Sequence, residues 1–172
     1  MPGDSRAAAP PFEELYREFL PRIYAYVRSQ IRSAADAEDV TAQVFVKAFQ
    51  AYDRFEMRGA TPAAWLFRIA RNASLDHHRA SARRERLQRT VESQPAAEAD
   101  PGDLAADRLS SARLLEEVAG LPERQQEALA LRHNGLSFLE VGELLDCSED
   151  AAKMLYHRAL KALRARVKGL AE

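Results

Sequence analysis

Basic residues recur at helical spacing near the end of this chain, and their chemistry suits a polyanion. Lys153, His157, Lys161, Arg164 and Lys168 follow one another at intervals of three and four, which places them on one face of a helix. The major groove of DNA accepts one helix, with its N-terminal half near base edges and its cations near phosphates. Two interpretations stay open at this point: a DNA-binding helix, or a solvated amphipathic helix whose charges only confer solubility.

A short capped helix and a tight turn precede this basic helix. Asn134-Gly135 is a pair that tolerates left-handed backbone and therefore suits the end of a helix. Ser137 and Glu140 have the spacing of a capping box, in which a hydroxyl and a carboxylate satisfy orphan backbone amides. A three-residue turn follows the short helix and ends at Ser148, which is suited to cap the next helix. This order is typical of a helix-turn-helix, and it favours DNA binding over mere solubility.

The apolar spacing of this second block predicts four helices, over about 104–119, 122–133, 138–145 and 149–167. In the last of them, the stripe that we expect to be buried consists of Ala152, Leu155, Tyr156, Ala159, Leu163 and Val167. The basic stripe lies opposite, so this helix is expected to pack with one face and to present cations with the other.

The first block of the chain also has helical periodicity. Apolar residues recur from Phe12 to Ile31, and Pro21 is expected to break or bend this helix. A second helix is predicted over 36–52, with Asp36, Glu38 and Asp39 in its first turn, where the helix dipole favours anions. The stripe that we expect to pack consists of Val40, Val44, Phe45, Ala48 and Phe49.

A third helix is predicted to begin near Pro62, a favourable first-turn residue. Its apolar side holds Trp65, whose neighbours Leu66 and Ile69 favour burial of the indole over stacking on a base. An Asn amide on the other side can both donate to and accept from a base edge, although such a residue can also cap a helix or sit exposed. The polar side consists of Arg68, Arg71, Asn72 and Arg79. No stretch alternates at period two for long enough to predict a strand, so we expect an all-α fold.

The formal net charge of −1 over 172 residues hides a segregation of charge along the chain. Residues 12–90 carry 14 Lys and Arg against 10 Asp and Glu, whereas residues 91–120 carry 2 against 7. Residues 149–168 carry 6 against 2. Two basic stretches therefore flank an acidic middle, whose lack of aromatic residues predicts a flexible linker over 90–103. Attraction to a polyanion depends on local charge rather than on the total.

Several other classes of protein are not supported by the sequence. A single cysteine, Cys147, excludes a disulfide framework and a cysteine-based zinc cluster, and it indicates a reducing compartment. Residues 1–11 read as a disordered tail without a signal peptide, and no apolar run approaches the length of a membrane span. The four histidines lack metal-ligand spacing, and no phosphate loop or nucleophile elbow is present. We therefore expect no enzyme activity, no metal and no cofactor.

Three stretches together resemble the extracytoplasmic-function (ECF) sigma factors, small bacterial RNA polymerase sigma subunits. The stretch that resembles the family's core-polymerase-binding helix is DAEDVTAQVFVKAF, residues 36–49. The one that resembles its promoter-melting helix is WLFRIARNASLDHHR, residues 65–79. The third, residues 121–164, is similar to its promoter-distal helix-turn-helix domain. Two departures stand out: Ala42 where the family usually has Gln, and Met154-Leu155 where it often has a Ser-Arg pair, so that promoter preference should be unusual.

The resemblance implies two small helical domains joined by a flexible acidic linker, the second a four-helix domain with a helix-turn-helix. The expected boundaries are a tail at 1–11, a core-binding and promoter −10 domain at 12–89, a linker at 90–103 and a −35-recognition domain at 104–172. The implied function is to bind core RNA polymerase, direct it to specific promoters and help melt the −10 region. The implied partners are the clamp helices of the largest polymerase subunit, the flap region, double- and single-stranded promoter DNA and an anti-sigma factor, in the bacterial cytoplasm and without membrane insertion.

The resemblance also assigns residues. Core binding falls to Asp39 and Gln43, one helical turn apart, with Val40 and Phe45 nearer the packing side; Asp39 can alternatively serve only as a charge at a helix N-terminus. The residues implied at the −10 element are Arg58, Arg68, Arg71, Asn72 and Arg79, and those implied at the −35 element are Ser148, Lys153, Met154, His157, Arg158 and Lys161. Further phosphate contacts are expected from Arg83, Arg84, Arg86 and Arg89. The acidic linker either mimics nucleic acid in a polymerase channel or is plain solvated disorder.

Two rival functions remain at this stage. A stand-alone helix-turn-helix regulator would explain the second domain and leave the first without a purpose, and it should bind duplex DNA unaided, usually as a symmetric dimer. An interaction protein that uses both helical bundles as docking surfaces would need no contact with DNA.

Overall fold

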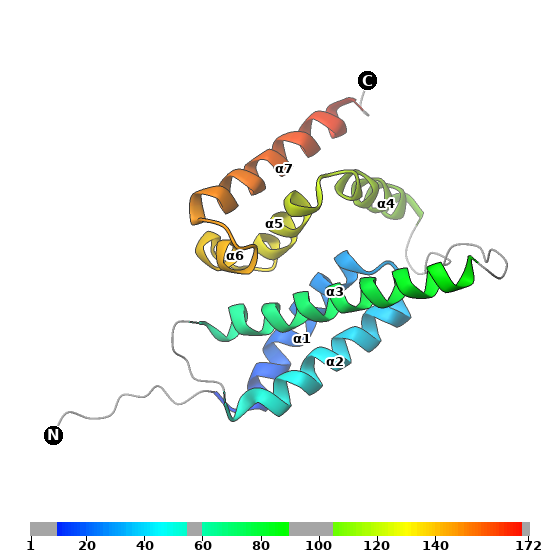
Figure 1. Cartoon of the computed structure of the whole chain (residues 1–172). Helices are drawn as coiled ribbons and strands as arrows, with labels where there is room; N and C mark the ends of the chain where they lie inside the picture. The colour runs from blue at the N-terminus through cyan, green and yellow to red at the C-terminus, as the bar shows by residue number, and fades with distance from the viewer. Residues whose placement is uncertain (1–9, 55–59, 90–104, 170–172) are drawn as a thin grey trace. The chain divides into compact units, whose positions relative to one another are not determined.

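The computed structural model describes residues 10–54, 60–89 and 105–169, and every regular element in these ranges is an α-helix (Figure 1). The all-α prediction is confirmed. The elements are α1 (Phe12–Gln30), α2 (Ala34–Tyr52), α3 (Pro62–Gln88), α4 (Ala105–Ala119), α5 (Glu123–His133), α6 (Phe138–Leu144) and α7 (Glu149–Gly169). Contacts between helices divide them into a first unit, α1–α3, and a second unit, α4–α7. The linker predicted over 90–103, and the predicted tail apart from Pro10 and Pro11, lie outside the described residues.

The first unit is a three-helix core in which each helix packs on the other two. At its centre the rings of Tyr26 and Phe67 meet edge to face, 5.5 Å apart, and both side chains are fully buried. Two capping residues set where the helices begin. The Ser33 hydroxyl accepts from the Asp36 amide at the start of α2, and the Thr61 hydroxyl accepts from the Ala64 amide at the start of α3. Local caps and a shared core therefore fix the faces of α2 and α3 that point to solvent.

The structure corrects four expectations about this unit. Helix α1 continues through Pro21. Pro21 is exposed, so the carbonyl that loses its backbone donor lies on the exposed side of the helix, where the loss costs least. Phe49 is 65% exposed rather than buried, and Trp65 is only partly buried. Helix α2 begins at Ala34, two residues earlier than predicted, so only Asp36 of the three acidic residues lies in its first turn.

The second unit packs α5 and α6 against α7, while α4 contacts α7 near its C-terminal end. Two arginines join separate elements through backbone carbonyls. Arg124 donates to the Leu145 carbonyl at 2.7 Å, and Arg166 donates to the carbonyls of Glu117 and Gly120 at 2.9 and 3.2 Å. The predicted four helices are confirmed, with α7 two residues longer than expected. Of the stripe that was predicted to be buried, Ala152 and Ala159 are buried, Leu155, Tyr156 and Leu163 are partly buried, and Val167 is 49% exposed.

Candidate docking and nucleic-acid interfaces

Of the four residues on α2 that were expected to bind core polymerase, two are exposed and two are buried. Asp39 and Gln43 are exposed and stand one turn apart on the same face. Val40 and Phe45 are only 3% and 5% exposed, and the Phe45 ring packs edge to face on Tyr16 of α1 at 4.9 Å. Asp39 and Gln43 are therefore available to a partner, whereas Val40 and Phe45 hold α2 against α1.

An apolar groove between α1 and α2 adjoins this face, and the sequence reasoning missed it. It encloses about 950 Å³ and is lined almost entirely by uncharged side chains, with Glu38 as its charged member. Its exposed apolar residues include Val46 at 56% and Phe49 at 65%, and the Phe49 ring meets Phe12 edge to face at 5.2 Å. The sequence carried a signal for it, because the apolar residues of 36–52 cover more of the helix than one packing stripe requires.

Helix α3 presents the residues that were expected at single-stranded DNA. Arg68, Asn72 and Arg79 are exposed, and Arg71 is partly exposed. Asn72 lies far from both ends of α3, so it does not cap this helix, and its amide faces solvent. Arg79 makes an exposed ion pair with Asp76 at 3.5 Å. The side chains implied as phosphate contacts beyond it are also exposed: Arg83, Arg84, Arg86 and Arg89. Arg58, with the rest of 55–59, lies outside the described residues.

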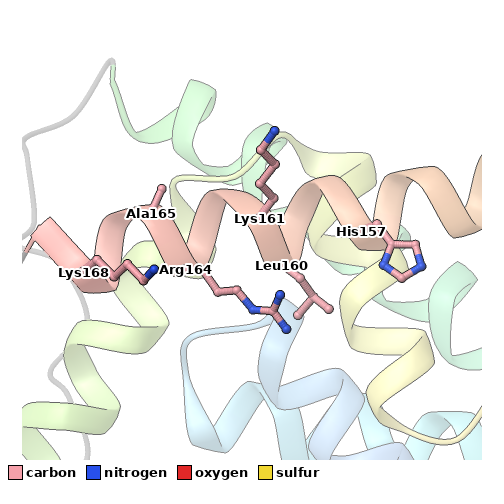
Figure 2. A pocket seen from close by; sticks show the side chains of 6 residues that line it. All are labelled: His157, Leu160, Lys161, Arg164, Ala165 and Lys168. Carbon is pink, nitrogen blue, oxygen red and sulfur yellow. The ribbon is translucent and has the colours of Figure 1, made fainter.

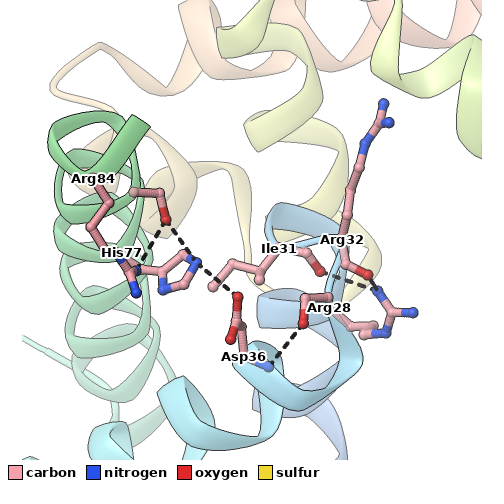
Figure 3. A network of polar contacts seen from close by, with 8 residues as sticks. Arg28, Ile31, Arg32, Asp36, His77 and Arg84 are labelled. Carbon is pink, nitrogen blue, oxygen red and sulfur yellow. Dashed lines mark hydrogen bonds and ion pairs between the residues drawn. The ribbon is translucent and has the colours of Figure 1, made fainter. Parts of the chain in front are cut away.

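A polar network ties the start of α2 to the middle of α3 (Figure 3). The Asp36 carboxylate lies 3.7 Å from Nε2 of His77, whose side chain is only 16% exposed. On the other side, the Ser81 hydroxyl lies 3.4 Å from the same His77 nitrogen and accepts from Arg84 at 3.5 Å. The network joins the helix that carries Asp39 and Gln43 to the helix that carries Asn72. The two faces therefore belong to one packed body.

The turns that were predicted for a helix-turn-helix are confirmed. Gly135 has a φ of 90° after α5, and the Ser137 and Glu140 side chains each bond the other residue's backbone amide, at 3.2 and 2.8 Å, as a capping box. The Ser148 hydroxyl accepts from the Ala151 amide at 3.1 Å and so caps α7. Gly142 is required by close packing, because a Cβ there would lie 2.7 Å from the Cys147 carbonyl oxygen.

Helix α7 carries the predicted basic face, with His157, Lys161, Arg164 and Lys168 projecting from it (Figure 2). All six residues implied at the −35 element are exposed: Ser148, Lys153, Met154, His157, Arg158 and Lys161. Phe138, the first residue of α6, lies against the inner edge of this face. Its ring centroid is 5.5 Å from that of Tyr156 and 5.9 Å from the Lys153 ammonium. Packing by α6 thus orients the N-terminal half of α7.

Among residues 10–54, 60–89 and 105–169, no group of three or more His, Cys, Asp or Glu side chains is arranged to hold a metal ion. No helix within the same residues is both long and apolar enough to span a membrane.

Family comparisons match both units. The Sigma-70 region 2 family matches residues 15–84, and the Sigma-70, region 4 family matches residues 111–163. These matches cover α2 and most of α3 in the first unit, and α5, α6 and most of α7 in the second.

Proteins that are similar to this chain in sequence are named as ECF RNA polymerase sigma factors. The chain is 35% identical over 156 residues to the ECF RNA polymerase sigma factor BldN of Streptomyces coelicolor, covering 88% of this chain and 58% of that protein. It is 30% identical to the ECF sigma factor SigE of Mycolicibacterium smegmatis, covering 94% and 63%. The chain thus spans less than two thirds of the length of these two relatives. It is 31% identical to the ECF sigma factor SigD of Mycobacterium tuberculosis, covering 94% of this chain and 77% of that protein.

Solved structures agree with the sequence relatives. The sigma factor RpoE in complex with the anti-sigma factor NepR from Bartonella quintana aligns with a TM-score of 0.72 at 27% identity, covering 91% of this chain and 96% of that one. CnrH in complex with the cytosolic domain of CnrY aligns with a TM-score of 0.69 at 25% identity, covering 92% and 88%. The matched regions, the extent of identity and the shared fold place this chain in the family of ECF RNA polymerase sigma factors.

Proposed function

We propose that this chain binds core RNA polymerase, directs it to specific promoters and helps to open the DNA at the −10 region. The observation that carries the proposal is that one packed unit presents two exposed faces, with an acidic residue and an amide on α2 and with cations and an amide on α3. Asp39 and Gln43 stand exposed on α2, and Asn72 stands exposed on α3, while the Asp36–His77 pair connects the two helices. A protein that only bound duplex DNA through α7 would have no use for this first unit.

The docking face suits the clamp helices of the largest polymerase subunit. Asp39 and Gln43 offer a charge and an amide, and the exposed rings and aliphatic groups around Phe49 offer apolar area beside them. Interfaces draw their affinity from a buried apolar centre and their specificity from polar groups around it. The α2 face has both components.

The α3 face suits a single strand. A base outside the stack exposes its Watson–Crick edge, which duplex DNA hides, and an Asn amide is able to read that edge. Arg68 lies one turn before Asn72 and Arg79 two turns after it, and both are exposed. These cations are placed to hold flanking phosphates while Asn72 captures the base. Arg71 and Arg58 are assigned to the same element.

The helix-turn-helix suits the −35 element. Its capped helix α6 orients α7, whose N-terminal half carries Lys153, His157 and Arg158 on the exposed face. Arg158 is proposed to read guanine, and Lys153 and Lys161 are proposed to contact phosphates. Ser148 caps the helix at the end that would enter the groove, next to the backbone of the DNA. This unit is also the one that we assign to the polymerase flap region.

An anti-sigma factor is the further partner that we propose. RpoE and CnrH, which share the fold of this chain, are each described in complex with another protein, the anti-sigma factor NepR and the cytosolic domain of CnrY. The α1–α2 groove and the α7 face are exposed surfaces that such a protein would cover. Because core polymerase is a cytoplasmic enzyme, we place the function of this chain in the bacterial cytoplasm.

One assay tests the proposal against its rivals. The purified chain is combined with core polymerase and a promoter library, and specific initiation is scored with and without the chain. A sigma factor gives initiation that depends on both the chain and the promoter sequence. A stand-alone regulator instead binds duplex DNA without polymerase and gives no initiation. An interaction protein gives neither initiation nor binding to duplex DNA. The result expected for a stand-alone regulator and the result expected for an interaction protein would each overturn the proposal.

A further inference from the structure

The exposed side chains at the start of α7 include one that does not share the chemistry of the others. The exposed residues between 149 and 161 are Glu149, Asp150, Lys153, Met154, His157, Arg158 and Lys161. Among these described positions, Met154 is the apolar exception, and half of its surface is exposed. A single exposed apolar residue is ordinary on a protein surface, so its meaning depends on its surroundings.

Met154 is surrounded by the polar side chains that α7 exposes to solvent. Asp150 and Arg158 lie one turn before and after it, and His157 lies three residues on, so polar side chains surround it along the helix. Ala152 and Ala159, which are fully buried, mark the opposite side of α7. Met154 therefore lies away from the buried side of α7. It stands near the middle of the face that the cations would bring against DNA.

The major groove offers few apolar groups to such a side chain. Donors and acceptors line the base edges, and the exception is the 5-methyl group of thymine, which apolar side chains contact. Methionine is unbranched and polarizable, so it adapts to an irregular apolar contact. We propose that Met154 is a specificity-determining residue, which contacts the 5-methyl group of a thymine in the upstream promoter element. This inference rests on the proposed function, because it needs α7 to lie in the major groove of a promoter.

The test removes the methyl group from the DNA and the thioether from the protein. The holoenzyme of core polymerase and the full chain first selects its preferred upstream element from a duplex library. Each thymine of that element is then replaced in turn by deoxyuridine, which lacks only the 5-methyl group. At one thymine the wild-type holoenzyme should bind about fourfold more weakly, the loss expected for ~0.8 kcal/mol of one buried methyl-sized group.

Protein variants test whether Met154 is the side chain that contacts this methyl group. Met154→Ala should bind the thymine duplex as weakly as wild type binds the deoxyuridine duplex, and it should show no further loss on deoxyuridine. Met154→Leu should retain the dependence on the methyl group, because it keeps an apolar side chain of similar size. Val167→Ala is the matched control, since Val167 is equally exposed on the same helix, 13 residues further on and ~20 Å along it. It should leave the deoxyuridine profile unchanged.

The outcomes separate this inference from the proposed function. If no deoxyuridine substitution weakens the wild-type holoenzyme, or if Met154→Ala keeps the same dependence as wild type, the contact is overturned while the sigma factor assignment stands. If the holoenzyme selects no upstream element at all, the proposed role of α7 fails, and the contact fails with it. A melting curve followed by circular dichroism confirms that each variant is folded; half-exposed Met154 should tolerate all of these substitutions.

Discussion

The first and the second unit of this chain are each stabilised internally by different kinds of contact. Among the ten largest fully buried side chains of the described residues, seven belong to α1–α3 and three to the second unit. In the first unit, aromatic and branched side chains such as Tyr26 and Phe67 interlock between helices that are distant in sequence. The second unit relies more on local devices: the capping box at Ser137, the left-handed turn at Gly135 and the close approach at Gly142.

This difference in packing determines how each unit holds its exposed helix faces in place. The first unit supports two faces on separate helices, so its function depends on the rigid packing between α2 and α3. The second unit presents one helix, so its function depends on the angle that the turn imposes between α6 and α7. Substitutions in the core should therefore damage the first unit most, and substitutions in the turns should damage the second.

The largest effect is expected for Phe67→Ala in the first core. Removing a fully buried ring leaves a cavity that costs about 3–5 kcal/mol of unfolding free energy. Trp65 is the chain's single tryptophan, so its fluorescence during denaturant unfolding reports on the first unit. The midpoint of that transition should fall sharply. An unchanged midpoint would show that the first unit does not depend on this core.

Charge at the docking face should matter next. Asp39→Lys combined with Gln43→Ala should weaken association with core polymerase by ~1–3 kcal/mol, the range of polar contacts at interfaces. Both side chains are exposed, so the tryptophan unfolding transition should stay where it is. Glu18→Lys makes the same reversal at an exposed position of α1 and serves as the control. Equal affinities for core of the double variant and the control would remove the docking assignment.

A turn substitution should damage the second unit alone. In Gly142→Ala, the new Cβ would meet the Cys147 carbonyl oxygen and the Ser148 backbone, so α6 and the turn must shift, at a cost of roughly 1–3 kcal/mol. Binding to duplex upstream-element DNA should weaken, whereas the tryptophan unfolding transition, which reports on the first unit, should not change. Gly169→Ala is the control, because a Cβ there would meet no atom within 4 Å. A lower midpoint of tryptophan unfolding in the Gly142 variant, but not in the control, would contradict the division into two independent units.

The sequence was most informative where the structure is determined locally. Spacing and capping residues predicted where the seven helices begin to within two residues, and the turn chemistry of Asn134-Gly135, Ser137 and Ser148 predicted the helix-turn-helix. Such features depend on neighbours within four positions, which a single sequence displays directly. The exposed positions of Asp39, Gln43 and Asn72 followed from helical periodicity alone.

Features that depend on packing between helices were less accessible. Phe49 and Val167 continue apolar stripes in sequence, yet both side chains are exposed. The groove between α1 and α2 arises from the packing of two helices, so the surplus of apolar residues over 36–52 indicates an exposed apolar surface but not the groove itself. The His77–Asp36 pair joins residues that are 41 positions apart, and no local pattern links them. Val40 and Phe45 were expected on the packing side of their helix, and their burial confirms that position.

The most direct measurement is permanganate reactivity of promoter thymines in the presence of holoenzyme carrying Asn72→Ala. Asn72 is exposed on α3, whereas the residues proposed for docking lie on α2, so binding to core and to closed promoter DNA should remain nearly intact. Thymine reactivity should fall roughly tenfold on duplex promoters, the consequence of losing one ~1.4 kcal/mol contact to a captured base. A bubble template that is already open separates the two causes: recovery there indicates strand separation, and an equal defect indicates base capture. If the variant opens the duplex promoter as well as the wild-type chain does, Asn72 does not act in melting, and the account of the first unit as a promoter-opening body is contradicted.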